Sequence, residues 1–149
     1  MTLKPPAVRV LPMSGEEFDG QPAEQVQSEF FLLDLPNRES GRYYYRTSGL
    51  NAVPGTIVLF QYASTIIASA VFESNEKFDQ PDGDYHGALL FDTKSIKVFD
   101  PIDAKTMRDV WAADFSRFGH VKVNLDPEKY PDFEERLSGI QTPPQTNAH

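Results

Sequence analysis

The spacing of strand-like apolar runs most constrains what this chain can fold into. Short runs rich in β-branched, aromatic or small apolar residues recur at intervals of about ten residues, with turn signals such as Pro54-Gly55 between them. The runs are residues 8–11, 30–33, 42–46, 56–60, 65–72, 88–91 and 95–99. This spacing is typical of a small β-barrel or sandwich.

Helical periodicity is confined to the C-terminal third. Asp100 provides a capping carboxylate directly before Pro101, which favours a helix start there. Apolar residues then follow at helical spacing, namely Met107, Val110, Trp111, Phe115 and Phe118. A last strand is expected over residues 120–125, and a short helix over residues 131–137 ends before Gly139. We therefore predict an α+β fold, a curved sheet or open β-barrel of five to six strands flanked by two to three helices.

The composition indicates one ordinary globular domain. The chain has 149 residues, 40% of them hydrophobic, and contains no cysteine. We expect residues 1–27 to form a partly irregular N-terminal arm, residues 28–139 the folded domain, and residues 140–149 a disordered tail or linker. No apolar run is long enough to span a membrane, so we expect a cytoplasmic protein without a membrane partner.

Charge is distributed unevenly along the chain. The formal net charge is −8, which disfavours broad, non-specific affinity for nucleic acid. Residues 41–72 nevertheless carry two arginines, Arg42 and Arg46, and no acidic residue. This segment is also aromatic and β-prone, so we expect any site for an anionic ligand there, although a buried sheet would have the same composition.

Motifs for catalysis are sparse. The sequence contains no glycine-rich phosphate loop and no nucleophile elbow, and His86 and His120 have no second ligand at metal spacing. The one enzymatic pattern places Asp82 after a proline and follows it with Asp92 and Lys94, an arrangement that metal-dependent nucleases use. Turn chemistry around Gly83 explains this pattern better, so we expect no catalytic residue, no metal and no cofactor.

Aromatic side chains supply the candidate binding residues. In an extended strand, Tyr43 and Tyr45 would share one face, as would Phe60 and Tyr62 in the next strand. If that face is concave it could stack a planar ring while neighbouring polar groups read the edge of the ring. The candidate residues are Tyr43, Tyr45, Phe60, Gln61, Tyr62 and Ser64. Filling of a barrel interior is the alternative role for these rings.

The order of elements over residues 42–72 resembles the EVE/YTH branch of the PUA-like superfamily. An extended aromatic segment ends in the basic and small polar residues Arg46, Thr47 and Ser48, and a turn, a strand ending in Tyr62 and a serine, and the run Ile-Ile-Ala-Ser-Ala-Val follow. The likeness extends over roughly residues 28–137. The doubled tryptophans of the methyladenosine-reading branch are absent, and so is the Gly-x-Lys-x-x-Glu-x-Arg motif of the related ASCH domains.

The resemblance implies a non-catalytic module that binds a modified, flipped-out nucleobase, most simply in DNA rather than RNA. Members of the superfamily serve as sensing domains of modification-dependent restriction systems, with the nuclease on a fused or associated domain. By the resemblance, Arg42, Arg46, Thr47 and Ser48 would contact the backbone or a base edge. Two alternatives stay open: a nuclease that uses Asp82, Asp92 and Lys94, and a module of the same fold that binds a protein or a small molecule.

Overall fold

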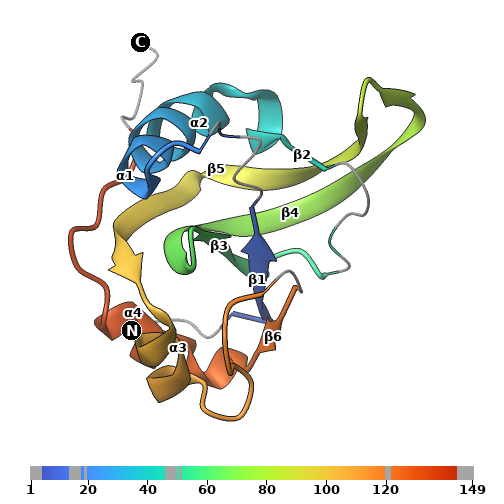
Figure 1. The fold of residues 1–149 in the computed structure, drawn as a ribbon. Coiled ribbons are helices and arrows are strands. Elements are labelled where there is room, and N and C mark those ends of the chain that lie inside the picture. The colour runs from blue at the N-terminus through green and yellow to red at the C-terminus, as the bar shows by residue number, and fades with distance from the viewer. Residues whose placement is uncertain are drawn as a thin grey trace.

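A six-stranded mixed sheet forms the centre of the computed structural model, which describes residues 5–13, 18, 20–45, 50, 52–119 and 122–143 (Figure 1). Its strands are β1 (Val8–Pro12), β2 (Tyr43–Tyr45), β3 (Ile57–Tyr62), β4 (Thr65–Asp82), β5 (Tyr85–Ile102) and β6 (Asn124–Leu125). They lie in the order β2-β5-β4-β3-β1-β6, with β1 parallel to β3 and the other pairs antiparallel. Because β2 and β6 are the two edges, the sheet is open.

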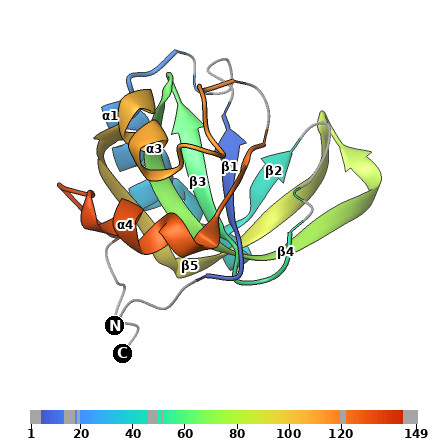
Figure 2. The ribbon, with the colours of Figure 1, turned by 90° about the horizontal axis from the view of Figure 1, so that it is seen from below.

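Helices cover the two faces of this sheet. One face carries the long helical segment (residues 23–37), which consists of α1 (Ala23–Val26), a π-helical stretch (Gln27–Asp34) and α2 (Leu35–Asn37). The other face carries α3 (Ala104–Val110) and α4 (Tyr130–Glu135). Short 3₁₀ turns at Glu39–Gly41 and Pro127–Lys129 lead into β2 and α4. Figures 1 and 2 show the two helical layers on opposite sides of the strands.

Strand β3 lies between two hydrophobic clusters. Val58 and Phe60 belong to the cluster beneath the long helical segment, whereas Leu59 belongs to the cluster beneath α3 and α4. Since successive side chains of a strand point to opposite faces, a strand covered on both sides must be apolar throughout. This explains the uninterrupted run Ile-Val-Leu-Phe in the sequence.

The β4–β5 hairpin extends well beyond the rest of the sheet. Both strands are 18 residues long, and most residues near the tip are exposed. We call residues 73–86 the hairpin arm; Figure 2 shows it projecting away from the helices. Gly83 takes a left-handed backbone conformation (φ 61°) in the turn at the tip, as the Gly-Asp signal predicts.

The expectation of a strand at residues 30–33 is wrong, because these residues belong to the π-helical stretch. Phe30 and Phe31 both point into the first cluster and are buried. A four-residue apolar run has no period that separates a strand from a buried helix. The preceding Ala-Glu-Gln-Val-Gln favours helix, and Pro36 is tolerated because it lies at the start of α2.

The expected strands at 88–91 and 95–99 are parts of one strand, β5. The residues between them form an irregularity within the β4–β5 ladder rather than a loop. Asp92 accepts a hydrogen bond from the backbone N–H of Lys94 at 3.0 Å. Ser95 donates its hydroxyl to the carbonyl of Asp92 at 2.6 Å and accepts the N–H of Val71 at 2.7 Å. The Ser95 side chain therefore satisfies a backbone donor where the ladder is interrupted.

The predicted helix cap at Asp100 is also wrong. Asp100 and Pro101 still belong to β5, and the N-cap of α3 is Asp103, whose carboxylate accepts from Thr106 N at 2.9 Å. The helix ends at Val110, much earlier than the apolar period suggests. Phe115 lies in the turns that follow α3 and is buried in the second cluster. Its burial there continues the helical spacing of apolar residues in the sequence although the helix has ended.

Other expectations agree with the structure. The predicted strands at 8–11, 42–46 and 56–60 correspond to β1, β2 and β3, and the predicted last helix corresponds to α4. The α+β class with an open sheet is confirmed. Of the expected tail, Gln141 still pairs with Val98 beside β5, while residues 144–149 lie outside the described part. Among the described residues, no helix has the length and apolar character needed to cross a membrane.

Candidate functional site

A cavity of about 290 Å³ opens between the long helical segment, β2 and Tyr85 of the hairpin arm. Its volume lies near the lower end of the range for small-molecule pockets, so it suits a single ring system. The lining is Phe18, Gln21, Glu29, Phe30, Asp34, Arg38, Tyr43, Tyr44 and Tyr85. We call it the aromatic pocket.

Five rings in this lining come from four separate parts of the chain. The Phe30 ring meets Phe18 and Tyr43 edge to face, with centroids 5.2 Å and 5.9 Å away. Tyr44 lies against Tyr85 of β5 at 5.3 Å, with an angle of 37° between the ring planes. Edge-to-face contacts hold ring orientation, so the walls of the aromatic pocket are fixed by packing.

Arg38 bridges the two groups of rings. Its guanidinium carbon lies 5.2 Å from the Phe30 ring centroid and 5.6 Å from that of Tyr44. The same guanidinium donates to the Asp34 carboxylate at 2.8 Å and to the carbonyl of Arg42 at 2.9 Å. Arg38 is thus held in place by a carboxylate one helical turn earlier and by the start of β2.

Glu29 brings a second carboxylate to the rim. It is exposed on the long helical segment and accepts a hydrogen bond from the Gln25 amide at 3.0 Å. Within the described part of the chain, no lysine, arginine or histidine pairs with it. The charge of Glu29 is therefore available to a ligand.

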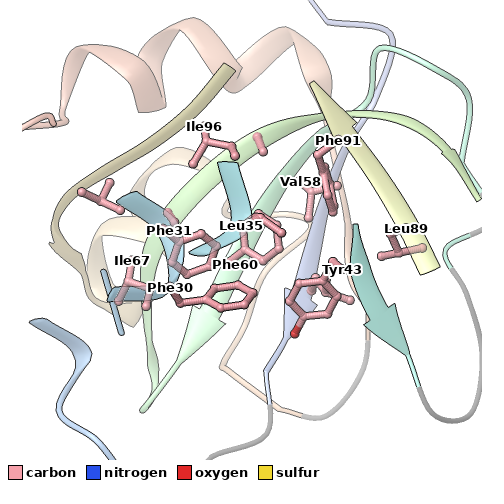
Figure 3. Packing of buried hydrophobic residues seen from close by; sticks show 14 of the residues in the cluster. Phe30, Phe31, Leu35, Tyr43, Val58, Phe60, Ile67, Leu89, Phe91 and Ile96 are labelled. Atoms are coloured by element: carbon pink, nitrogen blue, oxygen red, sulfur yellow. The ribbon is translucent and has the colours of Figure 1, made fainter. Parts of the chain in front are cut away.

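The predicted ring-stacking residues divide into pocket and core. Tyr43 lines the aromatic pocket, although it is only 8% exposed. Phe60 is fully buried against Phe31, with centroids 4.8 Å apart, and packs inside the cluster that Figure 3 shows. Tyr62 is also buried and donates its hydroxyl to the carbonyl of Gln21 at 2.5 Å. Phe60 and Tyr62 therefore support the pocket from behind and do not line it.

The other predicted ring and polar readers also lie outside the lining. Tyr45 packs over Gly87 of β5. Gln61 donates its amide to the carbonyl of Gly119 at 2.9 Å, and Ser64 occupies the tight turn between β3 and β4 with φ 60°. These contacts hold strands and turns together.

The basic residues expected to grip nucleic acid are only partly described. Arg42 forms a two-pronged ion pair with Glu76 of the hairpin arm, and this hydrogen bond raises the pKa of its guanidinium. Its charge is therefore matched within the molecule. Arg46, Thr47 and Ser48 lie outside the described residues.

The sequence analysis does not select most of the residues that line the pocket. These are Phe18, Gln21, Glu29, Phe30, Asp34, Arg38, Tyr44 and Tyr85. Phe30, Asp34 and Arg38 recur every four residues, which would place them on one helix face had the helix been recognised. Strand alternation places Tyr44 on the face opposite Tyr43 and Tyr45, so it is not among the predicted stacking residues. No local sequence signal links Tyr44 to Tyr85.

The two carboxylates of the nuclease alternative do not meet. Asp82 pairs with Tyr85 at the tip of the hairpin arm, whereas Asp92 pairs with Val71. Tyr85 and Asp92 are seven residues apart on β5, a separation of roughly 20 Å at the rise of a strand. One metal ion cannot bridge that distance, and the described residues contain no cluster of three metal-ligating side chains.

Comparison with known proteins shows the fold. No protein-family model matches the chain, and no curated protein matches it. The structure is similar to the crystal structure of ASCH from Zymomonas mobilis, with a TM-score of 0.53 and 12% sequence identity, over 88% of this chain and 96% of that one. The chain therefore shares its fold with that ASCH structure.

Proposed function

We propose that this chain is a non-catalytic reader that inserts one unpaired, modified nucleobase into the aromatic pocket, with DNA as the favoured nucleic acid. The observation that carries the proposal is the pocket itself, a ring-sized cavity walled by five aromatic side chains. Its PUA-like fold agrees with the EVE/YTH-type resemblance of residues 42–72, and that resemblance extends the proposal to sensing in a modification-dependent restriction system.

The chemistry of the lining fits a flat heteroaromatic ring. Tyr44 and Tyr85 offer ring faces, and stacking of a base on such a face contributes about 1–3 kcal/mol. The carboxylates of Glu29 and Asp34 accept hydrogen bonds, as the exocyclic amino groups of cytosine and adenine require. Arg38 closes the pocket between Phe30 and Tyr44.

The test is binding measured by fluorescence polarisation at low salt without metal. The probes are matched single strands and duplexes of DNA and RNA with unmodified, 5-methyl, 5-hydroxymethyl or N6-methyl bases. We expect at least one modified probe to bind about 10-fold more tightly than its unmodified match, a difference of about 1.4 kcal/mol. Failure of every probe to bind would overturn the proposal.

Two variants locate the site. Tyr44→Leu should weaken binding about 10-fold or more, because it removes a half-buried ring from the pocket wall. Phe118→Leu is the matched control, since Phe118 is also half-buried but packs against Phe115 in the second cluster. Equal losses in the two variants would place the site elsewhere.

A further inference from the structure

The charges at the aromatic pocket favour a positively charged ligand. The two arginines that the structure describes near the pocket are already matched, Arg38 by Asp34 and Arg42 by Glu76. Glu29 stays without a cationic partner within the described part of the chain. A ligand that enters the pocket therefore meets ring faces and an uncompensated negative charge.

The rings themselves already hold a flat cation. The guanidinium of Arg38 lies within 6 Å of the centroids of both Phe30 and Tyr44, the distance at which cation–π attraction operates. The Tyr85 ring lies against Tyr44, with centroids 5.3 Å apart, and adds to this aromatic surface. Electron-rich ring surface beyond that covered by Arg38 would attract a planar cation more strongly than a neutral ring of equal size.

The surroundings of the pocket limit attraction to phosphate. The hairpin arm, which supplies Tyr85, carries the exposed acidic residues Glu73, Asp79, Asp82 and Asp84, and Lys77 is the one basic residue between them. With a net charge of −8 as well, the chain can gain little from phosphate contacts. Extracting a paired base costs a few kcal/mol, least for a damaged or unpaired base, so a reader with weak phosphate contacts favours a base that is already unpaired.

One class of modified base meets both conditions. Methylation of adenine at N1 or of cytosine at N3 blocks the pairing edge and leaves the ring with a positive charge at neutral pH. Resting on the proposed function, we infer that the aromatic pocket selects such cationic, Watson–Crick-methylated bases in single-stranded DNA. Glu29 then supplies the counter-charge, and Tyr44 and Tyr85 supply the stacking surface.

Two isomeric probes separate charge from size. Identical single-stranded DNA oligomers would carry 1-methyladenine, which is cationic, or N6-methyladenine, which is neutral and has the same composition. We expect the 1-methyladenine probe to bind at least 10-fold more tightly. Glu29→Gln should remove most of this preference, because it lowers the affinity for the cationic isomer far more than the affinity for the neutral one.

Glu135→Gln provides the matched control. It changes the net charge by the same amount at an exposed position just inside the end of α4, in the opposite helical layer. Circular dichroism checks that both variants fold. If Glu135→Gln lowered the preference for 1-methyladenine as much as Glu29→Gln does, the inference would be overturned.

The remaining outcomes distinguish the inference from the function on which it rests. If the N6-methyladenine probe binds as tightly as the 1-methyladenine probe, the inferred selection for positive charge is wrong and base reading stands. If neither methylated adenine, nor 5-methylcytosine, nor unmodified DNA or RNA binds, base reading is overturned together with the inference.

Discussion

The ring of Tyr45 lies directly over Gly87 on the neighbouring strand. The two residues are partners in the antiparallel register of β2 and β5. A methyl group added at Gly87 would lie 2.1 Å from the Tyr45 hydroxyl oxygen and 2.4 Å from the backbone carbonyl of Glu76. The absence of a side chain at Gly87 therefore lets β2 sit close to β5, and β2 carries Tyr43 and Tyr44 into the aromatic pocket.

Gly87→Ala should destabilise the fold and weaken ligand binding together. Because the added methyl group meets both a ring and a backbone atom, the strands must separate, at a cost of about 1–3 kcal/mol. Denaturant unfolding measures the stability. Gly119→Ala is the control, since no atom lies within 4 Å of the added group. Equal stabilities for the two variants would mean that Tyr45 does not pack on Gly87.

Phe60→Ala should lower the free energy of unfolding by about 3–5 kcal/mol, because Phe60 is fully buried among Phe31, Tyr43 and Phe91. The conservative Phe60→Leu should keep ligand affinity at a temperature where the variant is folded. If the folded Phe60→Leu variant lost ligand binding, Phe60 would have to contact the ligand directly.

The strands could be predicted from the sequence where both faces are covered. The apolar run over residues 56–60 predicts a buried strand, and β3 is indeed buried on both faces. The run at residues 30–33 was misread because four apolar residues satisfy a strand and a helix equally. The break at Asp92 and the cap at Asp103 depend on side-chain hydrogen bonds that no periodicity reports.

The site was harder to predict than the sheet. Tyr43 could be selected because aromatic clustering is local, but its neighbours in the pocket come from a helix and a hairpin distant in sequence. Alternation separated Tyr44 from Tyr43, yet both line one cavity. No acidic residue lies near Arg42 within residues 41–72 of the sequence. Its ion-pair partner Glu76 is brought to it by the long β4–β5 hairpin.

The cap of α3 should make stability depend on pH in the acid range. Hydrogen bonds from Thr106 lower the pKa of Asp103 below its ordinary value of 3.8. The folded state thus binds fewer protons than the unfolded state there, so the contribution of Asp103 is present above pH 3.8 and is lost as the pH falls through the lower folded pKa.

Two substitutions isolate this effect in denaturant unfolding. Asp103→Ala should be less stable than the natural chain at neutral pH, and the gap should narrow in acid. Asp103→Asn keeps an acceptor for the Thr106 N–H without a titrating group, so its own capping contribution should not change with pH. A gap between the natural chain and Asp103→Ala that stays constant with pH would contradict the predicted linkage.

Tyr130 should impose the opposite dependence in alkali. Burial raises the pKa of its phenol far above the ordinary value of 10.0, and the carboxylate of Glu134 raises it further. The folded state therefore keeps the proton that the unfolded state releases, so stability falls as the pH rises above 10.0. Tyr130→Phe should lose about 1 kcal/mol at neutral pH with its hydrogen bonds to Ser69 and Glu134, yet decline less steeply in alkali.

Trp111 makes this comparison direct, because it is the sole tryptophan and lies beside Phe133 in the cluster that contains Tyr130. Its fluorescence follows unfolding in denaturant from neutral pH to well above pH 10.0 for both chains. The two stability curves should converge as the pH rises, because only the natural chain loses stability when the Tyr130 phenol ionises in the unfolded state. Parallel curves would show that the Tyr130 phenol titrates alike in the folded and unfolded chains, and a role for its burial in alkaline unfolding would then be wrong.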